Sequence, residues 1–468
     1  MQISLSFLGA CQNVTGSRFL VEVDDLKVLV DCGLYQERDF KKRNWDPFPV
    51  PPAEIDAVLL THAHLDHCGL LPKLAKEGFA GKIYCTPATA EIARIILLDA
   101  GHLQEEDAAY KAKRHRKEGR TGPFPDVPLY TAEDARRCLP LFSPVPYCRP
   151  ITLDGSAKAL FQDAGHVFGS SVITLRLKRD GDSRTILFSG DVGRKNMPIL
   201  QDPAVLNHAD YLLVESTYGD RVHQPAEDVQ GELAEIVNST YKAGGNLVIP
   251  SFALERSQDI LYHLNELRLA ERIPDLDVFL DSPMAIEITR VFEDHPELFD
   301  EEMAERISEQ MSPFSFPRLH MTVSTKESKE INNTSRPIIV IAGSGMCTGG
   351  RIKHHLVSNI SRPESTILFI GYQAVGTLGR SIAGGAKEVR ILGKKRQVKA
   401  RVTQMSGFSA HADRDELHQW LSGLEKPPRE VFVVHGEADS AKSFAGFLNE
   451  KTGWKVTVPA YEDRYVLS

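Results

Sequence analysis

The part of this sequence that most constrains its fold is residues 61–69, which read Thr-His-Ala-His-Leu-Asp-His-Cys-Gly. They follow the apolar run 57–60, so a β-strand is expected to end by delivering three histidines and an aspartate into a loop. Imidazole nitrogens and carboxylates hold Zn²⁺ at neutral pH. The alternatives are a solvated polar loop or a single structural zinc, but this density of ligands favours a metal centre.

The spacing within this loop predicts two metals rather than one. In an extended segment alternate residues share a face, so His62 and His64 can point at one metal. Asp66 and His67, after the chain turns, can reach a second metal. Further ligands must then come from distant parts of the chain.

Composition sets the class of protein. A chain of 468 residues is too long for one compact core and predicts two to four domains. No uninterrupted apolar stretch is long enough to span a bilayer, and no basic N-terminal region precedes a cleavage site. Seven cysteines are scattered without Cys-x-x-Cys spacing, which favours reduced thiols. We therefore expect a cytoplasmic protein with no membrane contact.

A net charge of −8 does not indicate a nucleic-acid binder, so a polyanionic substrate would have to be met by local basic patches. Residues 103–125 are strongly charged and contain the densest basic run. This run comprises Lys111, Lys113, Arg114, Arg116, Lys117 and Arg120. A solvated face and a rim that attracts phosphates are both compatible with it, and contact with substrate stays open.

The first part of the chain predicts antiparallel strands at 3–8, 19–23 and 26–30, followed by alternating helix and strand, with helices over 70–77 and 88–98. Asp31 ends the third strand. From this residue alone, a turn cap and a group that orients a metal ligand are equally compatible.

Two further strand ends carry candidate ligands. His166 follows a strand at 159–163, and Asp191 follows a strand at 185–188 between two glycines that allow close approach. A lone histidine is more often structural than a ligand.

A new series of strands and helices begins after Glu215, which is the last residue of the buried strand that starts at Tyr211. Strands at 246–250, 277–281, 338–341 and 366–370 are apolar throughout and are separated by helices at 229–243 and 255–269 and by a helical acidic segment to 311. Such strands imply a parallel sheet covered on both faces. His411 and His435 return to the pattern of the first part, so the series is an insertion. The expected domains are 1–219 and 406–468, which form one domain, and the inserted 220–405.

Together, Asp31, the His62–His67 cluster, His166, Asp191, Glu215, His411 and His435 resemble the motifs of the metallo-β-lactamase superfamily, in its β-CASP branch. The chain resembles short bacterial and archaeal relatives of the endonuclease subunit of the cleavage and polyadenylation specificity factor. The resemblance implies an α/β fold: an αββα sandwich with an inserted parallel-sheet α/β domain.

The resemblance also implies roles for these residues. Two zinc ions per chain would be bound, the first by His62, His64, His166 and Asp191, the second by Asp66, His67, Asp191 and His435. Glu215 and His411 would lie beside the scissile phosphate. Asp66 and Asp31 complete the expected catalytic set, with Asp31 in a supporting role.

The implied function is a zinc-dependent ribonuclease acting on single-stranded RNA, as an endonuclease, a 5′ exonuclease or both, leaving 5′-phosphate and 3′-hydroxyl ends. The histidine at 435 resembles RNA-acting members rather than Artemis-like DNA exonucleases, which usually have valine there. A small-molecule hydrolase of thioesters or lactams would not need the insert, and a catalytically silent scaffold would have lost ligands. The natural RNA, protein partners and oligomeric state stay open, and a homo-oligomer is compatible with the sequence.

A glycine-rich loop at 343–351 follows a buried strand and could hold a backbone phosphate on its amides. A plain turn is the alternative. The residues expected to contact substrate are Ser344, Gly345, Gly349, Gly350 and Arg351, together with Ser409.

Overall fold

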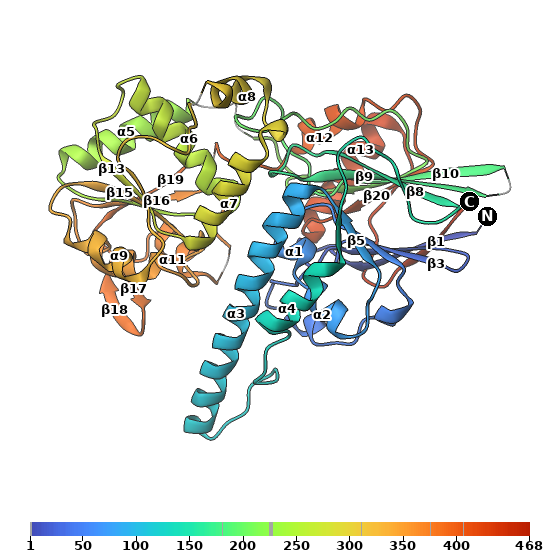
Figure 1. Ribbon diagram of the computed structural model, residues 1–468, viewed down its shortest axis with the longest axis horizontal. Coiled ribbons are helices and arrows are strands. Elements are labelled where there is room, and N and C mark those ends of the chain that lie inside the picture. Colours follow the sequence, from blue (N-terminus) through green and yellow to red (C-terminus); the bar gives the residue numbers. More distant parts are fainter. Residues whose placement is uncertain (1, 180, 224–227, 310, 375, 406) are drawn as a thin grey trace. The chain divides into compact units, whose positions relative to one another are not determined.

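A computed structural model describes residues 2–179, 181–223, 228–309, 311–374, 376–405 and 407–468 (Figure 1). The chain forms two compact units. Unit 1 comprises Met1–Val222 and Ala410–Ser468, and unit 2 comprises His223–Ser409. The sequence predicted boundaries at 219/220 and 405/406, and Ser406 lies outside the described residues.

Unit 1 contains two seven-stranded sheets. Sheet 1 has the strand order β22-β1-β2-β3-β4-β5-β6, and sheet 2 has the order β21-β20-β11-β10-β9-β8-β7. The strands of sheet 1 are β1 (Ile3–Gly9), β2 (Arg18–Val23), β3 (Leu26–Val30), β4 (Ala57–Leu59), β5 (Lys82–Cys85), β6 (Phe142–Pro144) and β22 (Arg464–Leu467). Those of sheet 2 are β7 (Ile151–Thr152), β8 (Ala157–Asp163), β9 (Ser171–Arg179), β10 (Asp182–Phe188), β11 (Tyr211–Glu215), β20 (Glu430–Val434) and β21 (Val456–Thr457).

The antiparallel opening predicted from the sequence is confirmed, because β2 pairs antiparallel with both β1 and β3. The pairing then becomes parallel, from β3 to β4 and from β4 to β5. Parallel strands end at the same edge of a sheet, so the loops after β3 and β4 lie next to each other. These loops carry Asp31 and the histidine cluster.

An aromatic core joins the two sheets. Phe7 of β1 lies 5.0 Å from Phe432 of β20 between ring centroids, and Phe19 of β2 lies 6.4 Å from Phe188 of β10. All four rings are buried. Burying each such side chain contributes about 1.5–3 kcal/mol, so the inner faces of the two sheets hold unit 1 together.

Strand β20 shows how one sheet serves two layers. Phe432 and Val434 belong to the core between the sheets, whereas Val431 and Val433 belong to a second core. That second core includes Trp420 of α12 (Arg414–Leu421) and residues of α13 (Ala438–Thr452). The alternation follows from the two-residue period of a strand. Helices therefore cover the outer face of sheet 2. The helices from α1 (Leu65–Cys68) to α4 (Ala132–Cys138) accompany sheet 1, which confirms the predicted αββα sandwich (Figure 1).

The helices of unit 1 outnumber the two that were predicted, and one of those two is longer than expected. They are α1 (Leu65–Cys68), α2 (Leu71–Lys76), α3 (Pro87–Glu118), α4 (Ala132–Cys138), α12 (Arg414–Leu421) and α13 (Ala438–Thr452). The sequence predicted a helix over 88–98, but α3 continues to Glu118 because Ala, Glu, Lys and Arg favour helix even without an apolar stripe. It ends where Gly119 adopts the left-handed conformation, with φ 62°.

Unit 2 contains a six-stranded sheet with the order β14-β13-β15-β12-β16-β19. Every pairing in it is parallel, as predicted. Its strands are β12 (Leu247–Pro250), β13 (Asp277–Leu280), β14 (Leu319–Met321), β15 (Ile338–Ala342), β16 (Thr366–Ile370) and β19 (Arg401–Met405), and β17 (Glu388–Ile391) with β18 (Lys394–Gln397) forms a separate hairpin.

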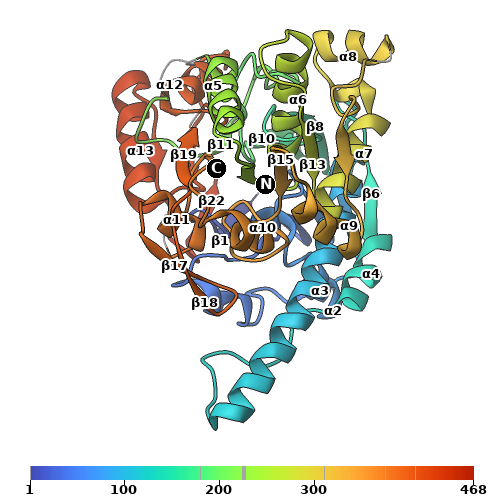
Figure 2. The ribbon, with the colours of Figure 1, turned by 90° about the vertical axis from the view of Figure 1, so that its left-hand side faces the viewer.

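Helices lie on both faces of this sheet (Figures 1 and 2). They are α5 (Val229–Lys242), α6 (Arg256–Leu269), α7 (Pro283–Asp294), α8 (Glu301–Ser308), α9 (Thr325–Glu330), α10 (Ile352–Asn359) and α11 (Leu378–Ala383). The acidic segment expected to be helical up to Met311 is interrupted after Asp294, where Pro296 begins a short 3₁₀ turn.

The described helices include none that is both long enough and apolar enough to cross a membrane. All seven cysteines are free thiols, and all but Cys148 are buried. Burial raises the pKa of Cys11 to about 12 and that of Cys32 to about 11, so these two thiols are protonated at neutral pH.

Candidate metal centre

The histidine cluster lies where β4 gives way to α1. His64 is extended, with φ −63° and ψ 146°, and α1 begins at the next residue. The helical turn takes Asp66 and His67 away from the face that carries His62 and His64. Close backbone contact holds the turn in place: the amide of Ser17 donates to the carbonyl of Asp66 at 2.8 Å. A Cβ at Gly33 would lie 1.6 Å from that carbonyl oxygen, so only glycine fits there.

A first group of ligand atoms brings together three strand ends. His62 follows β4, His166 follows β8 and Asp191 follows β10, and His64 completes the group. The Nε2 atoms of His62 and His166 each lie 3.5 Å from Asp191 Oδ2. The four ligand atoms lie within 4.8 Å of one another.

A second group contains Asp66, His67 and His435, the last delivered by the end of β20. His67 Nε2 lies 3.1 Å from His435 Nε2, and His435 Nε2 lies 3.6 Å from Asp66 Oδ2. His67 Nε2 is also 3.3 Å from Asp191 Oδ1. Asp191 therefore presents Oδ2 to the first group and Oδ1 to the second, the placement of a bridging carboxylate.

The chemistry of these donors fits bound cations. Asp191 Oδ1 is buried and has no hydrogen-bond partner among the described residues. His67 Nε2 and His435 Nε2 are 3.1 Å apart, so they cannot both carry protons along the line between them. At least one of these nitrogens therefore points a lone pair into the space between the rings. Buried acceptors without donors are costly unless a cation compensates them.

The protonation of the first group of histidines agrees with this interpretation. Burial lowers the pKa of His62 and His166 well below the ordinary value and lowers that of His64 to about 4. These rings are neutral at pH 7, the form that binds metal. Burial raises the pKa of Asp191, but His435, His67 and His62 outweigh it and bring the pKa well below 3.8.

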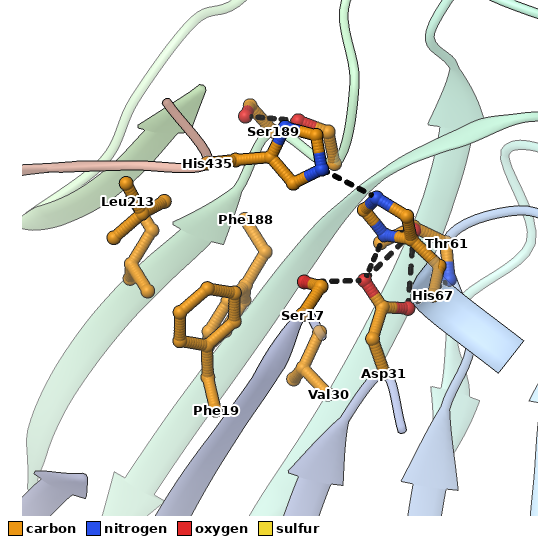
Figure 3. A pocket seen from close by; sticks show the side chains of 12 residues that line it. Ser17, Phe19, Val30, Asp31, Thr61, His67, Phe188, Ser189, Leu213 and His435 are labelled. Atoms are coloured by element: carbon orange, nitrogen blue, oxygen red, sulfur yellow. Dashed lines mark hydrogen bonds and ion pairs between the residues drawn. The ribbon is translucent and has the colours of Figure 1, made fainter. Parts of the chain in front are cut away.

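Asp31 orients one ligand without belonging to either group. Its Oδ2 accepts from His67 Nδ1 at 2.7 Å, and its Oδ1 accepts from the backbone amide of Thr61 at 2.8 Å (Figure 3). The contact fixes the orientation of the ring and leaves Nε2 toward His435 and Asp191. Asp31 is thus a positioning residue for His67.

Sequence reasoning missed three hydroxyl groups around the ligands. Ser17 donates to Asp31 Oδ2 at 3.3 Å, Thr61 Oγ1 lies 3.1 Å from His62 Nδ1, and Thr217 Oγ1 lies 3.2 Å from His435 Nδ1. Ser17 and Thr61 line a small pocket below the ligands with Asp31, His67 and His435 (Figure 3). Thr61 precedes the first histidine and could have been found from that position. No pattern in the sequence marks Ser17 or Thr217.

His411 and Glu215 form a pair beside the first group. His411 Nδ1 lies 3.1 Å and 3.2 Å from the two carboxylate oxygens of Glu215, which is fully buried. Glu215 also accepts from the amide of Val192 at 2.7 Å. The rings of His411 and His166 lie 4.4 Å apart between centroids. Although burial lowers the pKa of His411, Glu215 outweighs this effect and raises it to about 9, so the ring is protonated at neutral pH.

Comparisons with known proteins agree with this geometry. Residues 14–231 match the profile of the metallo-β-lactamase superfamily, residues 257–382 that of the β-CASP domain, and residues 395–459 that of a Zn-dependent metallo-hydrolase RNA specificity domain. Ribonuclease TTHA0252 of Thermus thermophilus is 39% identical over 440 residues, which is 94% of each chain. The chain belongs to the β-CASP branch of the metallo-β-lactamase superfamily. The predicted family is therefore confirmed, and the chain is a metal-dependent hydrolase.

This β-CASP protein is also similar to archaeal transcription termination factors and to a solved bacterial structure. Transcription termination factor FttA of Methanocaldococcus jannaschii is 32% identical over 457 residues, which is 95% of this chain and 68% of the relative. A solved structure of a protein of unknown function from Enterococcus faecalis aligns over 100% of both chains with a TM-score of 0.55 and 12% identity. At that identity the similarity concerns the fold alone.

The glycine-rich loop of the β-CASP protein lies in unit 2, between β15 and α10. Ser344 Oγ accepts from the amides of Thr348 at 3.1 Å and Gly349 at 3.3 Å, so the loop curls around this side chain. A Cβ at Gly350 would lie 2.3 Å from the carbonyl oxygen of Gly343. Gly345 lies against the half-exposed ring of Phe252. Ser409 is the last residue of unit 2.

Arg351 supports this loop from inside unit 2. Its guanidinium donates to Asp281 Oδ1 at 2.7 Å and to the carbonyls of Thr322 and Val323 at 3.0 and 2.6 Å. The other oxygen of Asp281 accepts from His355 and from Ser328, both at 2.6 Å. Burial raises the pKa of Asp281, but these three donors outweigh it and lower the pKa below 3.8.

Asp281→Ala should destabilise unit 2 by about 3–5 kcal/mol, because it leaves Arg351 and His355 without their shared acceptor. Hydrogen exchange should show lost protection in β13 and β15 and little change in β2 and β3. Lys326→Ala is the matched control. The Lys326 side chain is 87% exposed, and its 4.0 Å ion pair with Glu330 is too long and too exposed to contribute much stability. Equal effects of the two substitutions would contradict the supporting role of Asp281.

Proposed function

We propose that this β-CASP protein is a zinc-dependent ribonuclease that hydrolyses phosphodiester bonds of single-stranded RNA. The observation that carries the proposal is the His411–Glu215 pair, which places a protonated imidazole beside a cluster of metal ligands. Hydrolysis of a phosphodiester needs such a proton donor because the departing sugar oxygen is a poor leaving group. The similarity to Ribonuclease TTHA0252 along nearly the whole chain supports the same class of substrate.

The proposal assigns seven residues to two zinc ions that share Asp191. His62, His64 and His166 would hold one ion with Asp191 Oδ2, and Asp66, His67 and His435 would hold the other with Oδ1. Bound there, the ions would supply Lewis acidity at phosphorus and lower the pKa of a water toward about 7.

In the proposal, His411 acts on the departing 3′ oxygen rather than on phosphorus. A water gives one proton to the solvent, and the oxygen of the remaining hydroxide forms a bond to phosphorus. The bond from phosphorus to the 3′ oxygen breaks, and His411 gives its Nε2 proton to that oxygen. Glu215 keeps Nδ1–H oriented and favours the charged ring. Because the nucleophile is water rather than the 2′-hydroxyl, the products carry 5′-phosphate and 3′-hydroxyl ends.

The glycine-rich loop and Ser409 complete the proposal as substrate contacts. Ser344, Gly345, Gly349 and Gly350 are assigned to a backbone phosphate, and Arg351 serves by holding the loop through Asp281. The cytoplasmic location expected from the cysteines remains part of the proposal. Artemis-like action on DNA is the second candidate, because the metal cluster suits either nucleic acid.

The first test compares RNA and DNA of one sequence, each labelled at the 5′ or the 3′ end. RNA should be cut in preference, with products that bear 5′-phosphates, because the assignment of His435 follows the RNA-acting members of the branch. The two labels also separate endonuclease from 5′ exonuclease action. Equal turnover of DNA, or cleavage of DNA alone, would replace this proposal with the Artemis-like one.

The second test separates His411 from His435. The wild-type chain should contain close to two zinc ions. His435→Ala should weaken the second zinc, whereas His411→Ala should keep both ions and lose about 10²- to 10⁴-fold in single-turnover cleavage, the usual contribution of a general acid. Zinc content is measured beside cleavage for each variant. Loss of zinc from His411→Ala would show that the proposal assigns the proton transfer to the wrong histidine.

The third test uses pH. Since His411 acts in its protonated form, cleavage should persist below the pKa that Glu215 raises and fall as the pH rises through it. Glu215→Gln removes the negative charge that raises this pKa, so the falling limb should move to lower pH. The two profiles are compared at equal zinc content, because bound cations lower the pKa in both chains. A limb that does not move would show that Glu215 does not control the proton.

A further inference from the structure

The last turns of α3 form an arm whose two faces differ. In Figures 1 and 2 these turns extend beyond the sheets of unit 1, and the returning chain lies beside them. That returning segment, residues 119–131, covers one face. Leu129 donates its amide to Gln104 at 3.1 Å, His115 lies 2.8 Å from Asp126, and a Cβ at Gly122 would meet the His115 ring at 2.6 Å.

The opposite face of the arm is exposed and carries a mixed stripe. Its residues recur at helical spacing of three, four and seven, so they share one side of α3. They are Leu103, Glu106, Asp107, Tyr110, Lys113, Arg114 and Lys117. Leu103 is 54% exposed and Tyr110 is 64% exposed. Among the described residues, Glu106, Lys113 and Lys117 form no ion pair, and Asp107 pairs only with Lys111 on its own helix.

The stripe is complementary to itself about Tyr110. Acidic residues lie one turn before the tyrosine and basic residues lie one turn after it. If a second α3 packs antiparallel with a two-fold axis at Tyr110, Glu106 meets Lys113 of the other copy and Asp107 meets Arg114. Leu103 then meets the aliphatic stem of Lys117. A two-fold interface repeats each of these contacts, as isologous dimers do.

Neither the helix dipole nor an RNA ligand accounts for the whole stripe. Cations in the last turn stabilise the negative end of a helix, which explains Arg116 and Lys117 but not Lys113 and Arg114 in the preceding turn. An RNA chain would suit the basic residues, but the two acidic residues on the same face would repel its phosphates. Neither role involves the exposed leucine and tyrosine of the stripe.

We propose that the exposed face of the α3 arm, defined by the seven residues of the stripe, is a docking surface for a second copy of this chain in an antiparallel helix pair. The contact covers four turns of one helix, so it belongs to the small class of interfaces that form weak, reversible dimers. The proposal does not depend on the RNA substrate.

The test uses two charge-reversed variants of the full zinc-loaded chain. Glu106→Lys with Asp107→Lys makes the stripe uniformly basic, and Lys113→Glu with Arg114→Glu makes it predominantly acidic. Sedimentation velocity over a concentration series should show a wild-type dimer whose dissociation constant rises by about tenfold or more in each variant, because four contacts per dimer become repulsive. An equimolar mixture of the two variants should associate again, as a heterodimer.

The matched control reverses two exposed basic residues of sheet 2, as Lys158→Glu with Arg176→Glu, which changes the net charge as much as the acidic stripe does. This control should dimerise like the wild type. Three outcomes would overturn the proposal: a wild type that is monomeric at every soluble concentration, a mixture that does not associate, or a control as weak as the stripe variants. A monomeric wild type whose RNA affinity falls with Lys113→Glu and Arg114→Glu would assign the face to RNA instead.

Discussion

The candidate metal centre of unit 1 is arranged around one buried carboxylate, that of Asp191. It lies between two groups of imidazoles, and one of its oxygens has no hydrogen-bond donor in the part of the chain that the structure describes. An ionised carboxylate without donors is costly to bury, by several kcal/mol. The two sheets nevertheless bring the ends of β4, β8, β10 and β20 to this point. Packing of the apolar sheets provides the stability, and a cation compensates the polar cluster that they enclose.

Backbone strain accompanies the ligands. Asp31 and His435 both have positive φ, at 59° and 50°, a region that non-glycine residues adopt at a cost of about 1–3 kcal/mol. Each is held there by close contacts: the amide of Asp31 donates to the carbonyl of Leu59, and that of His435 donates to Ala10 at 2.7 Å. At both positions the chain leaves a strand and turns at once, which aims the side chain into the centre. At these two positions the strain accompanies a side chain that the centre uses.

The sequence predicted the layers of this fold better than its details, for physical reasons. Hydrophobic period and strand-end polar residues depend on local sequence, so the antiparallel opening of unit 1, the parallel sheet of unit 2 and the candidate ligands could be predicted from the residues, whereas the αββα sandwich was implied by the family resemblance. The length of α3 could not, because charged residues favour helix without leaving an apolar stripe. The contact of Arg351 with Asp281 joins residues 70 positions apart, and the hydroxyl of Thr217 meets His435 across 218 positions. Such contacts follow from tertiary structure alone.

The position of the insertion explains how His411 can follow a whole second unit in the sequence and still meet Glu215. Glu215 and His411 are 196 residues apart, yet unit 1 fixes both. Tyr218 bridges to Asp413, and the amide of Arg414 donates to the carbonyl of Arg221, so the chain leaves unit 1 and returns to it at adjacent backbone positions. The amide of Ala412 donates to Val192 at 2.8 Å, and Val192 in turn donates to Glu215. His411 is therefore positioned by hydrogen bonds within unit 1, and the geometry of the pair does not require unit 2 to supply it.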